Sequence, residues 1–358
     1  MMKKIIITTG GTGGHIYPAL AVGKKLLNRG MEVLFVGSST RMEKDLVPEE
    51  GFKFLGIDVY PFQNLKKIPS NIKAFLQAFK IVKKEQPDII IGFGNYISIP
   101  VLLAGVILGK KIYLQEQNAD LGMANKLFYK IAKKCFLAFD TTYEEISVKD
   151  QHKFLVTGNP LREDIYTMDK DAERERLKIG KDEKVLLVTG GSLGAKSLNE
   201  AVIKSLKDIY KDKSIRIYWA TGDKNFGEIN EKLEDQQIKV SDIIKPYFNN
   251  MINVMAAADL VVCRAGALTV SEIMQLEKPS ILIPYNSIKV GQYQNAKILS
   301  ENEAALIYSD SKADEAIEKA LELIKNDDEL NKMSRKAKNL KKSNAAEKIV
   351  ECLDIWRS

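Results

Sequence analysis

The stretch that decides the fold covers residues 8–26 and reads TTGGTGGHIYPALAVGKKL. It follows a short apolar run, opens on four glycines, and then takes a helical pattern beside His15, one of only two histidines. A glycine turn at the start of a helix leaves backbone N–H groups uncovered, and the helix dipole favours an anion there. The stretch therefore predicts either an anion site or, more simply, a tight turn from a strand into a helix.

Short β-branched runs alternate with helical patterns through the first half of the chain. Apolar strands that alternate with helices predict a parallel sheet covered on both faces. The expected strands are residues 3–9, 31–37, 52–57, 88–94 and 110–116, and the expected helices are residues 15–30, 70–84 and 99–109.

The second half of the chain repeats this plan. Residues 5–15 are echoed by 186–195, each with a glycine loop after an apolar run, and residues 87–94 are echoed by 258–266. Such spaced self-similarity predicts an α/β chain of two Rossmann-like domains. Turn residues near Gly158 suggest domains at 1–162 and 163–342. A last helix, 343–358, with Ile349, Leu353 and Trp356 on one face, is able to return to the first domain.

The composition narrows the class of protein. The 358 residues carry a net charge of +7, which indicates an anionic partner. The three cysteines, Cys135, Cys263 and Cys352, lie far apart, so neither a disulfide framework nor a zinc site is expected. The first apolar run is too short for a secretory signal or a membrane span. The sequence contains no RRM-like strand, zinc finger or basic tail, so we do not expect nucleic acid to be the anionic partner.

The two glycine loops do not match the common nucleotide-binding motifs. Ile16 stands where GxGxxG needs its third glycine, and Ala195 stands where the P-loop needs its last one. We expect no bound metal and no cofactor.

A series of longer motifs resembles a known family. GGTGGHIYPALA, LVPEEG, EQNADLGMANK, TGNPLR, GGSLGA, CRAGALTVSE and QYQNA occur in the order seen in the MurG family, and the resemblance runs from about Lys3 to the C-terminus. It implies the GT-B fold, with two Rossmann-like domains facing across a cleft. It also implies an inverting transfer of N-acetylglucosamine (GlcNAc) from UDP-GlcNAc to the 4-hydroxyl of the muramoyl sugar of lipid I, giving lipid II.

The same resemblance implies a biological setting. Lipid I is an undecaprenyl diphosphate, so the protein would be peripheral on the cytoplasmic face of the cell membrane. It would serve peptidoglycan synthesis, and through it cell shape and cell division. Other cell-wall synthesis proteins are candidate partners.

The resemblance further implies which residues bind substrate. Arg162 and Ser192 would contact the UDP diphosphate, and Glu272 would accept hydrogen bonds from both ribose hydroxyls. Gly13, Gly14 and His15 would hold the acceptor diphosphate. The other UDP-GlcNAc contacts would be Thr12, Gly13, Gly14, Asn118, Phe248, Ala267, Leu268, Thr269, Val270, Ser271 and Gln292. Two positions depart from the family pattern, Gly291 beside Gln292 and Asn95 in FGNYIS.

An inverting transfer needs a base for the attacking hydroxyl. His15 is one candidate, with a helix cap or a cation for the acceptor diphosphate as alternatives. Glu116 is the other candidate because it follows an apolar strand, where doubly wound folds place their sites. Its alternative role is a structural hydrogen bond to a loop.

Residues 63–84 interleave apolar and basic side chains. An apolar face rimmed by lysines suits an anionic membrane surface, although an ordinary amphipathic helix packed on the sheet has the same periodicity. The membrane residues proposed on this basis are Leu65, Lys66, Lys67, Ile68, Ile72, Lys73, Phe75, Phe79 and Lys80.

Other functions compete with this interpretation. UDP-GlcNAc 2-epimerases share the fold and the donor but act on a soluble substrate, which does not explain the lysine-rimmed segment. Glycosyltransferases for another lipid acceptor compete more closely. A sugar-nucleotide-binding protein without activity is the third alternative, and loss of turnover with intact UDP binding would favour it.

Overall fold

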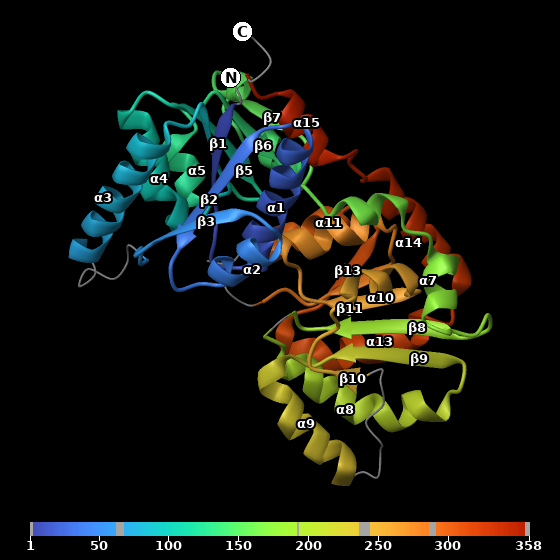
Figure 1. Cartoon of the computed structure of the whole chain (residues 1–358). Helices are drawn as coiled ribbons and strands as arrows, with labels where there is room; N and C mark the ends of the chain where they lie inside the picture. The colour runs from blue at the N-terminus through green and yellow to red at the C-terminus, as the bar shows by residue number, and fades with distance from the viewer. Residues whose placement is uncertain (1–2, 62–67, 192, 236–243, 286–290, 355–358) are drawn as a thin grey trace. The chain divides into compact units, whose positions relative to one another are not determined.

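The computed structural model describes residues 3–61, 68–191, 193–235, 244–285 and 291–354. The chain forms two compact units. Unit 1 comprises Met1–Glu163 with the segment that starts at Lys342, and unit 2 is Asp164–Lys341. Each unit is a sheet with helices on both faces (Figure 1).

Unit 1 is built on a parallel sheet of seven strands in the order β3-β2-β1-β4-β5-β6-β7. Strand β1 lies in the middle, where Ile5 pairs with Val33 of β2 on one side and with Ile89 of β4 on the other. The strands are β1 Lys4–Thr8, β2 Glu32–Ser38, β3 Lys53–Ile57, β4 Ile89–Gly92, β5 Lys111–Glu116, β6 Lys134–Leu137 and β7 Phe154–Val156.

The two faces of this sheet form separate cores because successive strand residues point to opposite sides. Ile5 and Ile7 pack with helices α1 and α15, whereas Ile6 packs with α3 and α4. The helices of unit 1 are α1 Gly13–Asn28, α2 Glu43–Glu49, α3 Ile68–Glu85, α4 Ile99–Ile107, α5 Met123–Phe128, α6 Asp140–Glu144 and α15 Ala345–Glu351.

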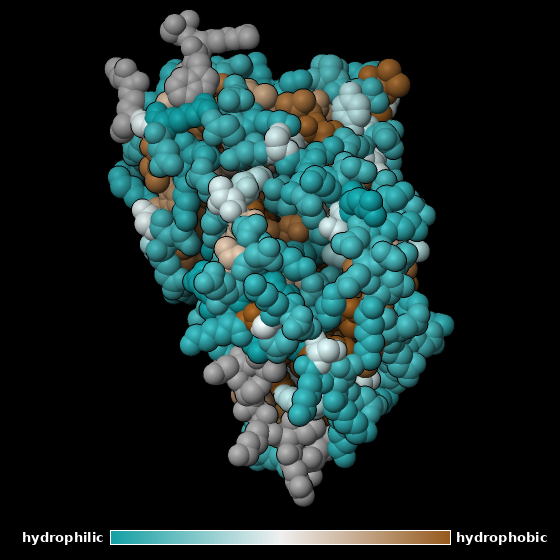
Figure 2. All heavy atoms as spheres, turned by 90° about the vertical axis from the view of Figure 1, so that its right-hand side faces the viewer, coloured by the Kyte–Doolittle hydropathy of each residue, from teal (hydrophilic) through white to brown (hydrophobic). Residues whose placement is uncertain are grey.

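Unit 2 repeats the arrangement with six parallel strands in the order β10-β9-β8-β11-β12-β13. The strands are β8 Lys184–Thr189, β9 Ile215–Ala220, β10 Ile244–Lys245, β11 Leu260–Cys263, β12 Ser280–Leu282 and β13 Ala305–Ile307. The helices are α7 Lys170–Arg176, α8 Lys196–Lys211, α9 Asp223–Asp235, α10 Met251–Ala257, α11 Ala267–Gln275, α12 Gln292–Ser300, α13 Ala313–Leu323 and α14 Asp327–Asn339. The face that carries α7 and α14 is mainly hydrophilic (Figure 2).

The predicted α/β class with two Rossmann-like domains is confirmed. The sequence repeat is also a structural repeat. In unit 1, β1 lies between β2 and β4, and in unit 2, β8 lies between β9 and β11. Strands β4 and β11 lie in the second pair of repeated segments. Each glycine loop follows the third strand in the order of its sheet. None of the helices in the described ranges is long and apolar enough to span a membrane.

Several predicted helix boundaries were wrong, two of them with consequences for the loop and for the core. Helix α1 begins at Gly13 rather than at residue 15, so the loop glycines form its first turn. The last helix ends at Glu351, although Leu353 still packs in the core of unit 1. Trp356 lies outside the described residues.

Candidate functional site

The glycine loop of unit 1 joins the end of β1 to the start of α1. Thr12 is the N-cap residue, with extended backbone, and its carbonyl oxygen accepts the N–H groups of His15 and Ile16. Gly13 and Gly14 supply the first N–H groups of the helix, which an α-helix leaves without a carbonyl partner of its own. The helix has 16 residues, so its dipole adds to the attraction for an anion at this end.

His15 lies in this first turn and is half-buried. Its Nδ1 atom is 3.2 Å from the hydroxyl of Thr12, and the hydroxyl of Thr9 donates to its carbonyl oxygen at 2.8 Å. Desolvation by burial lowers the pKa of His15 from 6.5 to about 4. The imidazole is therefore neutral at physiological pH, and a neutral imidazole can accept a proton.

The backbone at Gly94, after β4, lies against the His15 ring. A Cβ atom on Gly94 would sit 3.6 Å from His15 Cδ2, and the φ of Gly94 is +71°, a conformation that glycine adopts without strain. The two loops that follow β1 and β4 therefore meet at His15. This is the carboxyl end of the sheet, where doubly wound folds place their sites.

Glu116, at the end of β5, is buried and fully occupied by its own loop. Its carboxylate accepts hydrogen bonds from the N–H groups of Asn118 (3.0 Å) and Gly122 (2.7 Å) and from the side-chain amides of Asn118 (3.2 Å) and Asn125 (2.8 Å). Burial raises the pKa of Glu116, and these donors act against that rise. The arrangement matches the structural alternative for Glu116, and it also turns the Asn118 amide toward the carboxylate.

In unit 2, the turn after β11 leads into α11. Gly266 is the N-cap residue, Ala267 is buried, and Leu268 and Thr269 are half-buried. Val270 and Ser271 are buried, and the Ser271 hydroxyl donates to the Ala267 carbonyl at 2.9 Å. The start of α11 therefore offers backbone N–H groups more than it offers these two side chains.

Glu272 is half-buried on the same helix. It lies close enough to Cys263, at the end of β11, to influence that thiol. Burial raises the pKa of Cys263 to about 12, and the charge of Glu272 adds to this rise.

The remaining residues predicted to bind the donor differ in their solvent exposure and in their hydrogen bonds. The Phe248 ring is buried and packs edge-on against Tyr218 with 5.8 Å between centroids, so it offers a ligand only its backbone. The Oε1 atom of Gln292 accepts the N–H of Tyr285 at 2.8 Å. Arg162 is exposed. Ser192 lies outside the described residues.

Gly291, one of the two departures from the family pattern, is the N-cap residue of α12. Its φ is +65°, in the left-handed region that favours glycine. The backbone conformation thus accounts for a glycine at this position.

The proposed membrane residues on α3 fall into two groups. Ile68 and Ile72 are exposed, Ile72 to 57%, and Lys73 and Lys80 are exposed as well. Phe75 and Phe79 are partly buried and pack against the core, with ring centroids 6.1 Å apart. Leu65, Lys66 and Lys67 lie outside the described residues.

The sequence analysis missed further exposed apolar side chains on the same face of unit 1. Helices α3, α4 and α5 lie on one side of the sheet, and residues of all three belong to one core cluster (Figure 1). Spacing of three to four residues puts exposed side chains on one helix face. We call the exposed set the apolar patch: Ile68, Ile72, Leu76, Leu103, Ile107, Met123, Leu127 and Ile131. Exposed Lys126, Lys130 and Lys133 lie beside it in sequence.

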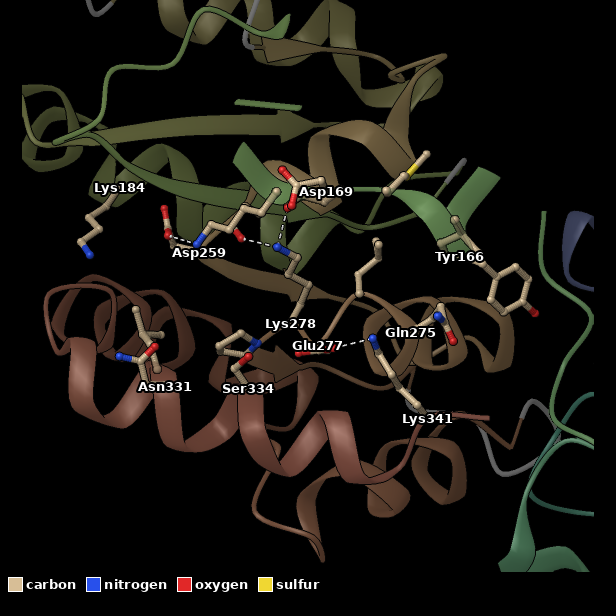
Figure 3. A pocket seen from close by; sticks show the side chains of 18 of the residues that line it. Tyr166, Asp169, Lys184, Asp259, Gln275, Glu277, Lys278, Asn331, Ser334 and Lys341 are labelled. Atoms are coloured by element: carbon tan, nitrogen blue, oxygen red, sulfur yellow. Dashed lines mark hydrogen bonds and ion pairs between the residues drawn. The ribbon is translucent and has the colours of Figure 1, made fainter. Parts of the chain in front are cut away.

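Unit 2 also contains a cavity of about 510 Å³ that none of the predicted site residues lines (Figure 3). It lies at the amino ends of the strands, because Lys184, Asp259 and Pro279 stand at or just before the starts of β8, β11 and β12. Ligand sites in such sheets lie at the opposite, carboxyl ends.

The charged groups described at this cavity are bonded within unit 2. Asp259 accepts hydrogen bonds from Lys170 at 2.6 Å and from Arg174 at 3.0 Å. Lys278 is buried and donates to the carbonyl oxygens of Ala256 and Ala258. Burial lowers the pKa of Lys278 to about 7. We therefore assign these charged groups a structural role in unit 2 and do not interpret the cavity as a ligand site.

Comparison with known proteins gives a consistent result over the whole chain. The glycosyltransferase family 28 N-terminal domain matches residues 5–137, and the glycosyltransferase family 28 C-terminal domain matches residues 185–349. A relative from Fusobacterium nucleatum subsp. nucleatum, named UDP-N-acetylglucosamine--N-acetylmuramyl-(pentapeptide) pyrophosphoryl-undecaprenol N-acetylglucosamine transferase, is 57% identical over 357 residues. The match covers 100% of this chain and 99% of the relative.

Solved structures agree with this match. MurG from Acinetobacter baumannii has a TM-score of 0.76 and 29% identity, with 98% of both chains covered. A UDP-N-acetylglucosamine 2-epimerase has a TM-score of 0.68 at 14% identity, with 98% of this chain and 95% of that chain covered. The second likeness shows the fold alone.

Proposed function

Because the chain belongs to glycosyltransferase family 28, and within it to the MurG family, we propose that it transfers GlcNAc from UDP-GlcNAc to the muramoyl sugar of lipid I. The observation that carries this proposal is the 57% identity, which extends over both units. The epimerase alternative rests on the shared fold and has no comparable support in the sequence.

We assign the donor to unit 2. The start of α11 presents backbone N–H groups after β11, at the carboxyl end of the sheet, which suits the diphosphate of UDP. Glu272 lies one to two turns further along the same helix, and its carboxylate is able to accept hydrogen bonds from the ribose hydroxyls. Phe248 offers backbone atoms to the uracil, and Gln292 contacts sugar hydroxyls. The α11 dipole stabilises the charge on the departing UDP.

We assign the acceptor diphosphate to the loop of unit 1, where Gly13 and Gly14 start the 16-residue helix α1. Between the two candidate bases, the contacts favour His15. Its imidazole is neutral, since desolvation lowers its pKa to about 4, whereas the Glu116 carboxylate already accepts four hydrogen bonds from its own loop.

The proposed reaction is a single displacement. The 4-hydroxyl oxygen of the muramoyl sugar attacks the anomeric carbon of GlcNAc and passes its proton to His15. As the new C–O bond forms, the bond from the anomeric carbon to the UDP oxygen breaks, and UDP leaves with the electron pair. Attack opposite to the leaving group inverts the configuration at the anomeric carbon.

The proposed activity is tested by transfer of radiolabel from UDP-GlcNAc to a lipid I analogue, with an EDTA control. We expect label in the lipid product with EDTA present. Release of UDP without labelled lipid would contradict the lipid I assignment and would favour an epimerase or another acceptor.

We further propose that the apolar patch rests on an anionic membrane surface, where the lipid acceptor resides. Three exposed isoleucine and leucine side chains of α3 and two of α4 lie on the same sheet face as Met123 and Leu127 of α5. Apolar side chains rimmed by lysines suit such a surface, and each lysine near it adds about 1 kcal/mol.

Vesicle binding tests the patch. We expect Ile72→Glu to weaken co-sedimentation with vesicles that contain anionic lipid. The matched control is Leu27→Glu, because Leu27 is also exposed but belongs to α1, on the other face of the sheet. Equal effects of the two substitutions would contradict this placement.

A further inference from the structure

Asn95 holds a backbone conformation that asparagine rarely adopts. Its φ is 66° and its ψ is 155°, a region that is essentially reserved for glycine and that costs about 1–3 kcal/mol for other residues. Such a conformation persists only where the surroundings hold it, and it is concentrated at functional sites. Asn95 follows β4, in the loop that meets His15.

The side chain of Asn95 reaches the glycine loop of unit 1. Its Nδ2 atom donates to the carbonyl oxygen of Gly10 at 3.0 Å. The same atom would lie 2.5 Å from a Cβ on Gly11, so the amide packs directly on the loop backbone. The Ser98 hydroxyl adds a second tie, because it donates to the carbonyl oxygens of Gly94 and Thr8. The loops after β1 and β4 are thus bonded to each other.

Glu43 holds the loop from the other side. It is the first residue of α2 and is 0% exposed. Its Oε2 atom accepts the N–H of Gly11 at 3.0 Å, and its Oε1 atom accepts the N–H of Ser38, at the end of β2, at 2.8 Å. A Cβ on Gly10 would lie 2.1 Å from Oε1, so the carboxylate occupies the space that a side chain there would need.

These contacts divide the loop into two parts. The carbonyl of Gly10 and the N–H of Gly11 are bonded to Asn95 and Glu43. The carbonyl of Gly10 is thereby turned toward an amide, and a carbonyl that pointed at an anion would repel it. The N–H groups of Gly13 and Gly14 belong to the helix start, where an anion is favoured.

We propose that Asn95 and Glu43 form a two-sided clamp that holds the Gly10 and Gly11 backbone so that the helix start presents its N–H groups to the acceptor diphosphate. Both are positioning residues, because they act through the glycine backbone. The inference rests on the proposed function, which assigns this loop to the acceptor.

The decisive variant is Asn95→Gly, which separates the strain from the hydrogen bond. Glycine adopts the observed φ and ψ without cost but has no amide for Gly10. We expect the KM for the lipid I analogue to rise about five- to tenfold, as for the loss of one hydrogen bond. The KM for UDP-GlcNAc should stay unchanged, and the midpoint of thermal unfolding should stay level or rise. A purely structural role for Asn95 would not give this combination.

Two further variants and one control variant test the clamp. Asn95→Asp keeps the shape and the strain but cannot donate to Gly10, so the acceptor KM should rise at least as much. Glu43→Gln keeps the size of the side chain but replaces one acceptor oxygen by an NH₂ group. That group cannot accept a hydrogen bond from its backbone N–H partner, so the KM for the acceptor should rise in this variant as well. Glu303→Gly is the matched control, because Glu303 also has a positive φ, 57°, but lies in unit 2. It should relieve strain without changing the acceptor KM.

Amide exchange at Gly11 gives a readout that does not depend on turnover. In Asn95→Gly this amide should exchange faster than in the parent chain. Unchanged KM values together with unchanged exchange would overturn the clamp, as would an equal rise of both KM values with a lowered unfolding midpoint. If the parent chain transferred no sugar to lipid, the proposed function would fail, and exchange at Gly11 would still decide for or against the clamp.

Discussion

The glycine loop after β8 and the glycine loop after β1 have similar sequences, but the two units hold them differently. In unit 2 the loop backbone packs mainly on other backbone, and one side chain, the amide of Asn225, donates to the carbonyl oxygen of Leu193 at 3.2 Å. A Cβ on Gly194 would lie 2.1 Å from the carbonyl oxygen of Thr221, and one on Gly222 would lie 2.4 Å from the nitrogen of Gly194. These glycines are needed because two chain segments touch.

In unit 1 the loop backbone meets side chains instead. A Cβ on Gly10 would approach Glu43, and one on Gly11 would approach the amide of Asn95. The same repeated motif therefore serves two purposes. In unit 2 it permits close chain contact, and in unit 1 it is held by side chains from α2 and the β4 loop. A loop fixed by side chains beside His15 suits the proposed acceptor site, and close backbone contact suits the proposed donor site.

The largest expected effect is on turnover. His15→Gln removes the proposed base from the unit 1 loop, so kcat should fall by about 10²- to 10⁴-fold. UDP binding, measured by calorimetry, should stay within error because the donor is assigned to unit 2. Equal losses in turnover and UDP affinity would remove His15 from the acceptor side.

A stability difference between the loops comes next. Gly194→Ala places a methyl group against a backbone carbonyl at φ +73°, so we expect the free energy of unfolding to fall by about 3 kcal/mol or more. Gly11→Ala, at φ +91°, meets a side-chain amide that is able to move, so its cost should be smaller. Denaturant unfolding of both variants gives the comparison. A larger loss for Gly11→Ala would reverse our reading of the loops.

The donor side predicts a smaller effect on affinity. Glu272→Ala removes a charged acceptor for the ribose hydroxyls, so the KM for UDP-GlcNAc should rise about 10- to 100-fold. The KM for the lipid I analogue should not follow. Unchanged affinity for UDP-GlcNAc would show that the ribose assignment is wrong.

The pH dependence separates the two roles left open for His15. Desolvation lowers its pKa from 6.5 to about 4, so a base role predicts that kcat/KM stays level from neutral pH downward and is lost as the pH falls through that lowered pKa. A cationic role would give the opposite sign, because activity would then rise as the ring gains a proton. A pH profile of kcat/KM for the parent chain, with stability checked at each pH, distinguishes them.

The fold could be predicted from the sequence because the strands are short apolar runs and the same alternation of strands and helices occurs in both halves of the chain. Boundaries were less accurate. Helix α1 starts at Gly13, but glycine is a poor helix former, so the pattern placed its start at residue 15. On α3, periodicity identified two apolar sides without showing which one packs on the sheet. Phe75 and Phe79 face the core, and Ile72 faces outward.

The candidate site could be predicted only in part from the sequence. Motifs placed His15 at the glycine loop and Glu116 just after an apolar strand, but the roles of Glu43 and Asn95 depend on contacts across 32 and 85 residues. A single sequence gives no signal for such a pairing. The four hydrogen bonds of Glu116 were hidden for another reason, since they depend on how its own loop turns back.

Amide hydrogen exchange on the full chain tests the central claim, that the acceptor uses the loop of unit 1 and the donor uses unit 2. The exchange rates are measured with UDP alone and then with the lipid I analogue alone. We predict that UDP slows exchange at Ala267, Leu268 and Thr269 and leaves Gly13 and Gly14 unchanged, and that the lipid analogue does the reverse. Protection of Gly13 and Gly14 by UDP, with the start of α11 unaffected, would contradict the account.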